Sequence, residues 1–415
     1  MADVRAERAA FNVQVAPRLA EVIGVSSQPP GARSSRFAYF EDESRFLVVA
    51  GAQEGADVDL AFALGLTYRG TKRLVLVLPA GLAFPTMQRA PWFRPEVQPE
   101  IWLHDGSTVD REPLPSRDST FEALERRLEP GDDLHKELRR AATAVHLGVR
   151  SPSVYSLVEW ATTHERLDAG HRRGERSWHC MGQRVLSIRP TRSGLALTAG
   201  IHYTDAARAP QIVELSTGEE LDAGAIEAIK DAVVAGVGER FGGVAPIGRQ
   251  DEHWLQAVIR RDPSLVGVEQ PALREIPAWR PRGTGSATGA GWGRGFIDLL
   301  GIDGHGDIRI VETKLADNAD DLLVLQGLDY YVWATAYRQV LLDRLGASRH
   351  ASLEIHYVIG ADDKDNVKVS RFVAAQARGL DDMVRWRFQT VRGWYPKPGG
   401  PDRPDVRLLT VGEVP

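Results

Sequence analysis

One run of residues, GFIDLLGIDGHGDIRIVETKL at positions 295–315, constrains the fold of this chain more than any other part of its sequence. Two apolar stretches flank an Asp-Gly-His-Gly turn, and an Asp-Gly pair in that position is a strong signal for a β-hairpin. Because strand side chains alternate between the two faces of a sheet, Glu312 and Lys314 share one face. Asp298 belongs to the opposite strand, and we expect it across from them at the open end of the hairpin.

This group of charges is unusual for the end of two apolar strands, because burying a charge is costly unless the charge binds something. Mg²⁺ prefers carboxylate oxygens and keeps several of its own waters, so Asp298 and Glu312 are candidate ligands, with the backbone carbonyl of Thr313 as a third. Such a metal shields a phosphate and lowers the pKa of an attacking water. Lys314 is suited to orient that water or to stabilise charge that builds on the phosphate.

The stretch resembles the PD-(D/E)XK nuclease superfamily, whose αβββαβ core carries Asp on its second strand and (D/E)xK on its third. The resemblance covers about residues 250–395 and implies a restriction-endonuclease-like core. DEHWLQAVIRRDPSLVG would be its first helix, with Glu252 as the acidic residue near the metals. REIPAW would be the first strand, and EIHYVIG the last core strand. A helix at 320–344 would follow the ExK strand, where Gln326 and Tyr330 match the QxxxY pattern and lie at i and i+4 on one face.

The triplet alone is a weak signal, because Asp362-Asp363-Lys364 matches it as well. The composition adds weight, since only seven of the 51 basic residues are lysine, and a lysine at the end of a buried strand is therefore an unusual choice. The alternative is a hairpin held by a purely structural salt bridge. For the first acidic residue, Glu269 and Glu275 remain alternatives to Glu252.

Charge gives limited information about a nucleic-acid partner. The chain has a net charge of −5, and residues 247–415 hold 22 basic against 23 acidic residues. The basic residues are nonetheless segregated, and a local basic patch can steer a polyanion. We expect contacts to nucleic acid from Tyr330, Arg280, Arg282 and Arg294. Trp279 and Trp292 border the Gly-rich run at 283–295 and are further candidates, whereas Tyr331, Trp333 and Tyr337 are more typical of a helix core.

The N-terminal part has a different pattern. FLVVAGA and KRLVLVLPAG are continuous apolar stretches on either side of a helical stretch, which predicts a parallel βαβ unit. We interpret residues 45–150 as a Rossmann-like α/β domain that acts as a sensor. No phosphate-binding glycine motif is present. Ligands of such sheets bind beyond the carboxyl ends of the strands, so Gln53 and Glu54 are the candidate ligand-binding residues. The alternative is a tight turn that enters a helix.

The remaining segments complete a multidomain α/β and α+β chain. We expect an N-terminal helix and a mobile segment over 1–44, an α+β connector over 151–246 and the nuclease domain over 247–415. The single cysteine excludes a disulfide framework and a cysteine-built zinc site. The spacing of His164, His171, His179 and Cys180 fits no zinc pattern. The longest apolar runs are too short to span a membrane, and the first residues lack the apolar core of a secretory signal, so we expect a cytoplasmic protein that does not bind membranes.

The expected function is that of a metal-dependent endonuclease, using Mg²⁺ or Mn²⁺ to hydrolyse phosphodiester bonds, with DNA expected as the substrate. A nuclease of this type joined to another domain is typical of restriction and antiviral defence effectors, and the arrangement resembles that of CARF nucleases. It implies a homodimer gated at the N-terminal domain by a small molecule or a protein activator. Two alternatives remain: a DNA repair or structure-specific endonuclease without a ligand gate, and a catalytically weak DNA-binding protein. The sequence does not decide between DNA and RNA.

Overall fold

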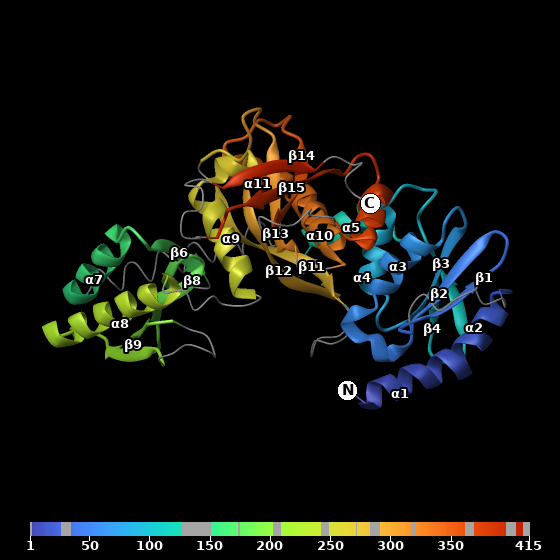
Figure 1. The fold of residues 1–415 in the computed structure, drawn as a ribbon, viewed down its shortest axis with the longest axis horizontal. Coiled ribbons are helices and arrows are strands. Elements are labelled where there is room, and N and C mark those ends of the chain that lie inside the picture. Colours follow the sequence, from blue (N-terminus) through green and yellow to red (C-terminus); the bar gives the residue numbers. More distant parts are fainter. Residues whose placement is uncertain are drawn as a thin grey trace. The chain divides into compact units, whose positions relative to one another are not determined.

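The computed structural model describes residues 2–25, 35–126, 151–172, 175–201, 209–241, 249–270, 272–282, 291–316, 321–361, 369–395 and 404–409 (Figure 1). Its architecture is mixed α/β, with sheets of five, five and six strands in the described part of the chain. Two compact units are present. The first contains residues 1–127, 264–392 and 404–415, and the second contains residues 128–263 and 393–403. Residues 26–34, within the segment 1–44 where a mobile stretch was expected, lie outside the described residues, as do residues 127–150.

The N-terminal sheet of the first unit has five strands whose spatial order follows the chain. The strands are β1 (Ala38–Glu41), β2 (Arg45–Val49), β3 (Arg73–Pro79), β4 (Glu100–His104) and β5 (Val109–Glu112). Strands β2 and β3 are parallel, as the two apolar stretches predicted, and β4 continues the parallel pairing, while β1 and β5 pair antiparallel at the two edges. The sheet is therefore mixed. Its described strands never reverse their order, so it lacks the switch point at which doubly wound sheets bind ligands.

Helices cover both faces of this sheet. On one face lies an N-terminal helix made of α1 (Ala2–Ala10), a π-helical turn η1 (Phe11–Val15) and α2 (Ala16–Val22), whose apolar residues share a core with Val75 and Val77 of β3. Neighbouring residues of a strand face opposite ways. Leu74 of β3 accordingly lies against α3 (Leu60–Tyr68), on the other face.

The C-terminal sheet has the strand order β11-β12-β13-β14-β15-β16. The strands are β11 (Leu273–Arg282), β12 (Gly291–Ile302), β13 (Ile308–Leu315), β14 (Leu353–Gly360), β15 (Arg385–Arg392) and β16 (Asp405–Leu409). Strands β11, β12 and β13 pair antiparallel, and β13, β14 and β15 pair parallel. The helices α10 (Leu323–Ala336) and α11 (Arg338–Leu345) follow β13, and α12 (Arg371–Gly379) follows β14. The three strands, the helix and the next strand occur at the expected positions.

The structure joins the N-terminal and C-terminal sheets in one compact unit, whereas the sequence analysis assigned them to separate domains at 45–150 and 247–415. Helix α3 packs against α12, and the backbone of Phe93 pairs with that of Leu380. The apolar residues of α3 lie on all of its sides, a pattern typical of a helix that packs against two neighbours. A sequence pattern shows that such a helix is buried, but it does not show which segment covers it.

The second unit is an antiparallel sheet packed by helices. Its elements are α7 (Pro152–Thr163), β6 (Asp168–Arg172), β7 (Glu175–Cys180), β8 (Gln183–Pro190), β9 (Gly194–Ala199), β10 (Gln211–Ser216), α8 (Ala223–Phe241) and α9 (Arg249–Arg261). The sequence analysis assigned α9 to the nuclease domain as its first helix. In the structure Trp254 and Ala257 of α9 belong to the core of the second unit. The amphipathic pattern of α9 shows that one face of the helix is buried, but it does not show which of the two cores buries that face. No described helix is long and apolar enough to cross a membrane.

Helix α4 (Phe84–Arg89), the short turn η3 (Ala90–Trp92) and α5 (Arg117–Glu125) complete the described N-terminal part. Helices α4 and α5 contact α10 of the C-terminal part; in Figure 1 α4 is blue, α5 teal and α10 orange. The ring of Trp92 lies 6.3 Å from that of Tyr331, and the hydroxyl of Tyr337 donates to the carbonyl of Leu124. Helix α10 is therefore enclosed between the C-terminal sheet and the N-terminal helices.

Candidate functional site

The candidate site forms where β12 and β13 stop pairing. The backbone ladder between the two strands ends at Leu299 and Val311. Beyond this point, the carboxylate of Asp298 accepts the hydrogen bond that a backbone carbonyl of β12 would otherwise accept from β13. Its Oδ2 atom accepts two hydrogen bonds from Thr313, one from the backbone N–H at 2.8 Å and one from the side-chain hydroxyl at 2.6 Å. This contact fixes Asp298 at the open end of the hairpin, where the sequence predicted it.

The backbone of Thr313 presents its carbonyl to the same region. The N–H and C=O of one strand residue point to the same side of the strand. The N–H of Thr313 points toward β12, where it meets Asp298, so its carbonyl also faces the β12 side. Asp298 and the Thr313 carbonyl therefore offer oxygen atoms along the same gap between the two strands.

Glu312 is buried, with 1% of its surface exposed. Its Oε1 accepts a hydrogen bond from Nε2 of Gln326 at 2.5 Å, and Nζ of Lys314 lies 3.9 Å from the same oxygen. Within 323–334 of α10, Gln326 is the one residue that is not fully buried. The expected grouping of Glu312, Lys314 and Gln326 is thus present, and the neutral amide of Gln326 is one of the groups that hold the carboxylate.

Tyr330 forms part of the wall of this site. It is 1% exposed, and burial, together with the nearby carboxylates of Glu312 and Asp298, raises the pKa of its hydroxyl well above the ordinary value. The phenol therefore stays protonated at neutral pH. A β-carbon on Gly295 would lie 3.0 Å from the Tyr330 oxygen, so a glycine is needed there. Buried in this way, Tyr330 supports the site from within and does not form an exposed contact to nucleic acid.

The arginines expected to bind nucleic acid lie on β11 and β12. Arg280 donates to Asp329 at 3.1 Å and lies over the ring of Tyr330, with 23% of its side chain exposed. Arg282 is exposed and donates to the carbonyl of Arg294. Arg282 is thus the one best placed to meet a ligand from solvent. The Gly-rich residues 283–290 lie outside the described chain.

Among the three candidates for a further acidic residue, Glu275 has the most informative position. The pairing of β11 with β12 is interrupted between Arg274 and Ile276, and its register leaves Glu275 opposite Asp298. Glu275 also has a φ of 49°, which is uncommon for a non-glycine residue and clusters at functional sites. No sequence signal predicts that conformation.

The other two acidic candidates are placed differently. The backbone of Glu269 bonds to the carbonyl of Ile302, near the hairpin turn and away from the open end. Glu252 lies on α9, which belongs to the second unit, whereas Asp298 and Glu312 belong to the first. Across the described residues no three His, Cys, Asp or Glu side chains are grouped so that they could hold a metal ion. A metal at the hairpin would thus take its side-chain oxygens from Asp298 and Glu312.

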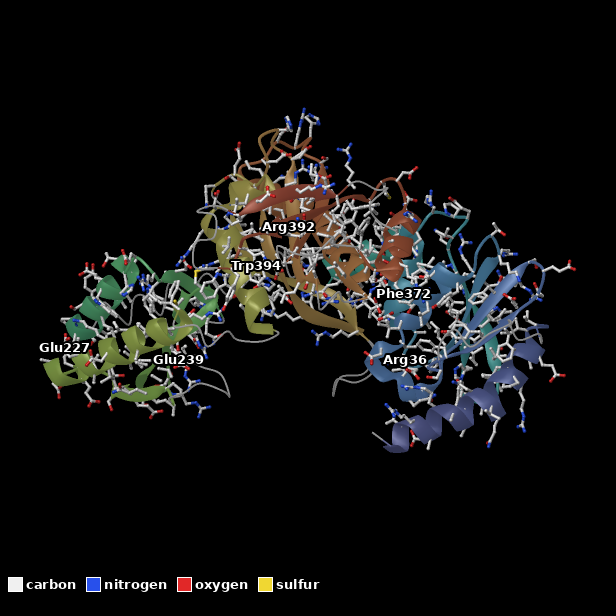
Figure 2. The ribbon with its side chains drawn as sticks, in the orientation of Figure 1. Arg36, Glu227, Glu239, Phe372, Arg392 and Trp394 are labelled. Atoms are coloured by element: carbon white, nitrogen blue, oxygen red, sulfur yellow. The ribbon has the colours of Figure 1, made fainter. Side chains whose placement is uncertain are left out.

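The N-terminal candidates, Gln53 and Glu54, lie in the turn η2 (Ala52–Asp57) after β2. Glu54 is 4% exposed, and its carboxylate binds Arg8 at 2.6 Å and Arg36 at 2.6 Å, the latter labelled in Figure 2. Gln53 folds back over Gly51. Glu54 therefore joins this turn to the N-terminal helix through Arg8, and its carboxylate is already held by two guanidinium groups.

The remaining sequence candidates do not form a metal site in the described structure. Nε2 of His179 lies 2.9 Å from the Ser177 hydroxyl. Burial raises the pKa of the Cys180 thiol to about 11, so the thiol is protonated and unreactive at neutral pH. The backbone N–H of His305 donates to Asp303 within the hairpin turn. Residues 362–364, the second acidic-lysine triplet, lie outside the described chain.

A second charged cluster lies at the other end of β13. Arg309 binds the carboxylates of Asp303 and Glu354, and Glu354 also accepts from Arg387 at 2.9 Å. Nε2 of His356 lies 3.0 Å from Glu354. Burial, with Arg387 and Arg309 nearby, lowers the pKa of His356 to about 3, so its ring is neutral. Every carboxylate in this cluster faces a guanidinium group.

Comparisons with known proteins give no further information about this geometry. The chain matches no family model, no curated protein and no solved structure. The candidate site is therefore argued from the residues of this chain alone.

Proposed function

We propose that this protein is a metal-dependent nuclease that hydrolyses phosphodiester bonds at the open end of the β12–β13 hairpin. One observation carries the proposal. Two carboxylates, Asp298 and Glu312, lie on neighbouring strands where the strands part, Asp298 bonded to Thr313 and Glu312 to Gln326, with Nζ of Lys314 3.9 Å from Glu312. Oxygen donors of this kind, grouped beside a lysine, are the basis for proposing a divalent-cation site.

The donor set fits Mg²⁺ or Mn²⁺. Carboxylate and carbonyl oxygens are the ligands that these hard cations prefer, and Mg²⁺ needs only one or two carboxylates because it keeps several waters. Asp298, Glu312 and the Thr313 carbonyl would hold the ion. When bound, it would supply the positive charge that activates a water and stabilises the phosphate. The residues present do not fit zinc, which takes Cys and His ligands in most sites.

The other residues of the site have distinct proposed roles. Nζ of Lys314 lies 3.9 Å from Oε1 of Glu312, and the lysine side chain is 15% exposed. The ammonium can therefore reach both the carboxylate and a phosphate oxygen. Gln326 holds Glu312 in place through its amide. Arg282 and, in part, Arg280 would bind the phosphates of nucleic acid beside the site, for which DNA is the proposed substrate.

The described structure favours a nuclease without a ligand gate over a gated defence effector. The described strands of the N-terminal sheet do not reverse their order, and the Glu54 carboxylate is bound by two arginines. Helices of the N-terminal half also cover α10, so that half is part of the unit that carries the site. A role in repair or in recognition of a DNA structure fits these features better.

The test is to incubate the full chain with plasmid, linear duplex, single-stranded DNA and RNA, each with Mg²⁺, Mn²⁺ or EDTA. Cleavage of at least one substrate with either metal, and none in EDTA, is the expected result. The matched control is Glu312→Gln, which keeps the shape of the side chain and removes its charge. Equal cleavage by wild type and Glu312→Gln, or full cleavage in EDTA, would contradict the proposal.

A further inference from the structure

A buried ion-pair network connects the N-terminal half of the first unit to α10. Arg89, at the end of α4, is 5% exposed, and Asp329 of α10 is 3% exposed. The guanidinium group donates two parallel hydrogen bonds to the Asp329 carboxylate, each 2.8 Å long. Its third nitrogen lies 2.7 Å from Asp59, the residue before α3, which also accepts from Thr86. Paired bonds of this kind fix both the distance and the orientation of their partners.

The network stays charged inside the protein. Burial by itself lowers the pKa of the Arg89 guanidinium, but the carboxylates of Asp329 and Asp59 outweigh this effect and raise the pKa above its ordinary value. Arg280 of β11 donates to the same Asp329 oxygen atom that Nη2 of Arg89 contacts. Removing one partner of such a buried group leaves another charge uncompensated, which is costly. The geometry of α10 against its neighbours is therefore strongly specified.

Asp329 and the residues of the candidate site lie on the same short part of α10. Gln326 precedes Asp329 by three positions, which is about 4.5 Å along a helix axis, and Tyr330 follows it directly. Gln326 binds Glu312, and the Tyr357 hydroxyl, from the residue paired with Glu312 across the sheet, donates to the Val324 carbonyl of α10 at 3.1 Å. A shift of α10 would thus move the amide that holds Glu312.

We propose that Arg89 is a positioning residue for the proposed metal site: by clamping Asp329, this arginine from the N-terminal half fixes α10 and, through Gln326, the carboxylate of Glu312. The inference rests on the proposed function. It makes the N-terminal half a necessary part of the site, because a chain that lacks residues 1–127 leaves Asp329 without Arg89. The partners of this ion pair are 240 residues apart in sequence.

Another ion pair between the same two halves serves as a matched control. Arg117 of α5 binds Asp381 at 2.6 Å and donates to the Pro91 carbonyl. The pair is about a quarter exposed, with 27% and 24% of the two side chains accessible, and Asp381 lies outside α10. Losing it removes an arginine–aspartate contact between the halves without releasing the helix that carries Gln326.

The experiment uses the full chain as wild type, Arg89→Lys, Asp329→Asn, Arg117→Met and Glu312→Ala. Each is titrated with Mn²⁺, followed by the loss of the free Mn²⁺ signal in electron paramagnetic resonance, and each is melted. Arg89→Lys keeps the buried charge but not the two parallel bonds. We expect Arg89→Lys and Asp329→Asn to weaken Mn²⁺ binding about tenfold or more, which is typical of residues that orient a metal ligand. Arg117→Met should bind as wild type does, and Glu312→Ala should show little binding.

Single-turnover cleavage over a range of Mn²⁺ concentrations completes the test. Arg89→Lys should cleave slowly at low Mn²⁺ and recover at high Mn²⁺, a rescue that a purely structural defect would not show. Folded Arg89→Lys with wild-type Mn²⁺ affinity would overturn the positioning role, and so would loss of the fold in both network variants. Wild type that binds Mn²⁺ through Glu312 but cuts no nucleic acid would instead remove the proposed nuclease function and leave the positioning role standing.

Discussion

The carboxylates at the two ends of strand β13 have different partners. At the Arg309 end, each carboxylate faces a guanidinium group, and Glu354 is bound by both Arg309 and Arg387. At the Glu312 end, the carboxylates accept hydrogen bonds from an amide, a hydroxyl and a backbone N–H, and Nζ of Lys314 lies 3.9 Å from Glu312. The first end pairs its carboxylates with guanidinium groups. The second groups two carboxylates with an amide and a lysine, a set that would suit a divalent cation, and this difference separates a structural cluster from a candidate site.

The largest effect should come from removing the carboxylates at the open end. We expect Asp298→Ala and Glu312→Ala each to reduce cleavage by about a thousandfold, the upper range for losing one preorganised electrostatic group. Both variants should stay folded, with a melting temperature close to that of wild type for Glu312→Ala and a lower one for Asp298→Ala, which leaves the buried Thr313 N–H without its acceptor. Single-turnover cleavage and thermal melts check this. Loss of the fold in either variant would place these residues with the structural cluster and erase the contrast.

Lys314→Arg is the next test, because it exchanges one cation for another at the same strand end. Lysine is a compact ammonium that approaches a phosphate oxygen at one point, whereas arginine is a wide planar group. Beside Glu312 the guanidinium group would pair with the carboxylate, as Arg309 does with Glu354, and compete with the metal. Cleavage should fall about a hundredfold, while DNA binding changes little. A variant that cuts at the wild-type rate would show that Lys314 is only a diffuse counter-charge.

At the Arg309 end of β13, a substitution should lower the free energy of unfolding and leave the rate of cleavage unchanged. Glu354→Gln leaves Arg309 and Arg387 without their shared carboxylate, and breaking a buried pair in this way costs about 3 kcal/mol. The expected result is a lower free energy of unfolding in urea, with wild-type cleavage per folded molecule. Asp307→Asn, in the same hairpin, is the control for a change of charge outside the Glu354 pairs. If Glu354→Gln lost cleavage while remaining stable, the division between the two ends would be wrong.

The smallest effect concerns pH at the structural end. The pKa of His356 is about 3 in the folded protein, below the ordinary value of 6.5, so the unfolded chain binds a proton first as the pH falls. The stability that His356 contributes is therefore complete above pH 6.5 and is lost as the pH falls toward 3. Between pH 6.5 and 5 the loss is about 2 kcal/mol. Urea unfolding of wild type and His356→Gln measures it, and the variant should lose less. Equal losses would show that the ring is not neutral in the fold.

The sequence predicted the parts of this structure that depend on local patterns. The turn at 303–306, the alternation along β13 and the helical spacing of Gln326 follow from residue type and position, so the group of Asp298, Glu312, Lys314 and Gln326 could be named before any coordinates. The metal and the reaction remain predictions.

Other features depend on contacts that no local pattern records. Arg89 and Asp329 are 240 residues apart, and nothing in either neighbourhood marks them as partners. The φ of 49° at Glu275 coincides with an interruption in strand pairing, and its residue type does not predict it. Helix α9 has an amphipathic face that would suit either unit, so the sequence analysis assigned it to the nuclease core although Trp254 packs in the second unit. The sequence indicated which residues are buried, but it did not indicate which residues pack against them.

The position of α3 has a consequence for how this protein is made. Its apolar surface is covered on one side by α12, whose Arg371 contacts Tyr68 of α3 across 303 residues of chain. A ribosome adds roughly 5–20 residues per second, so the nascent N-terminal half would wait roughly 15–60 s for that cover. During this interval the apolar surface of α3 is exposed to solvent. Synthesis of this chain should consequently depend on a chaperone that shields α3, and truncated products that end before α12 should aggregate.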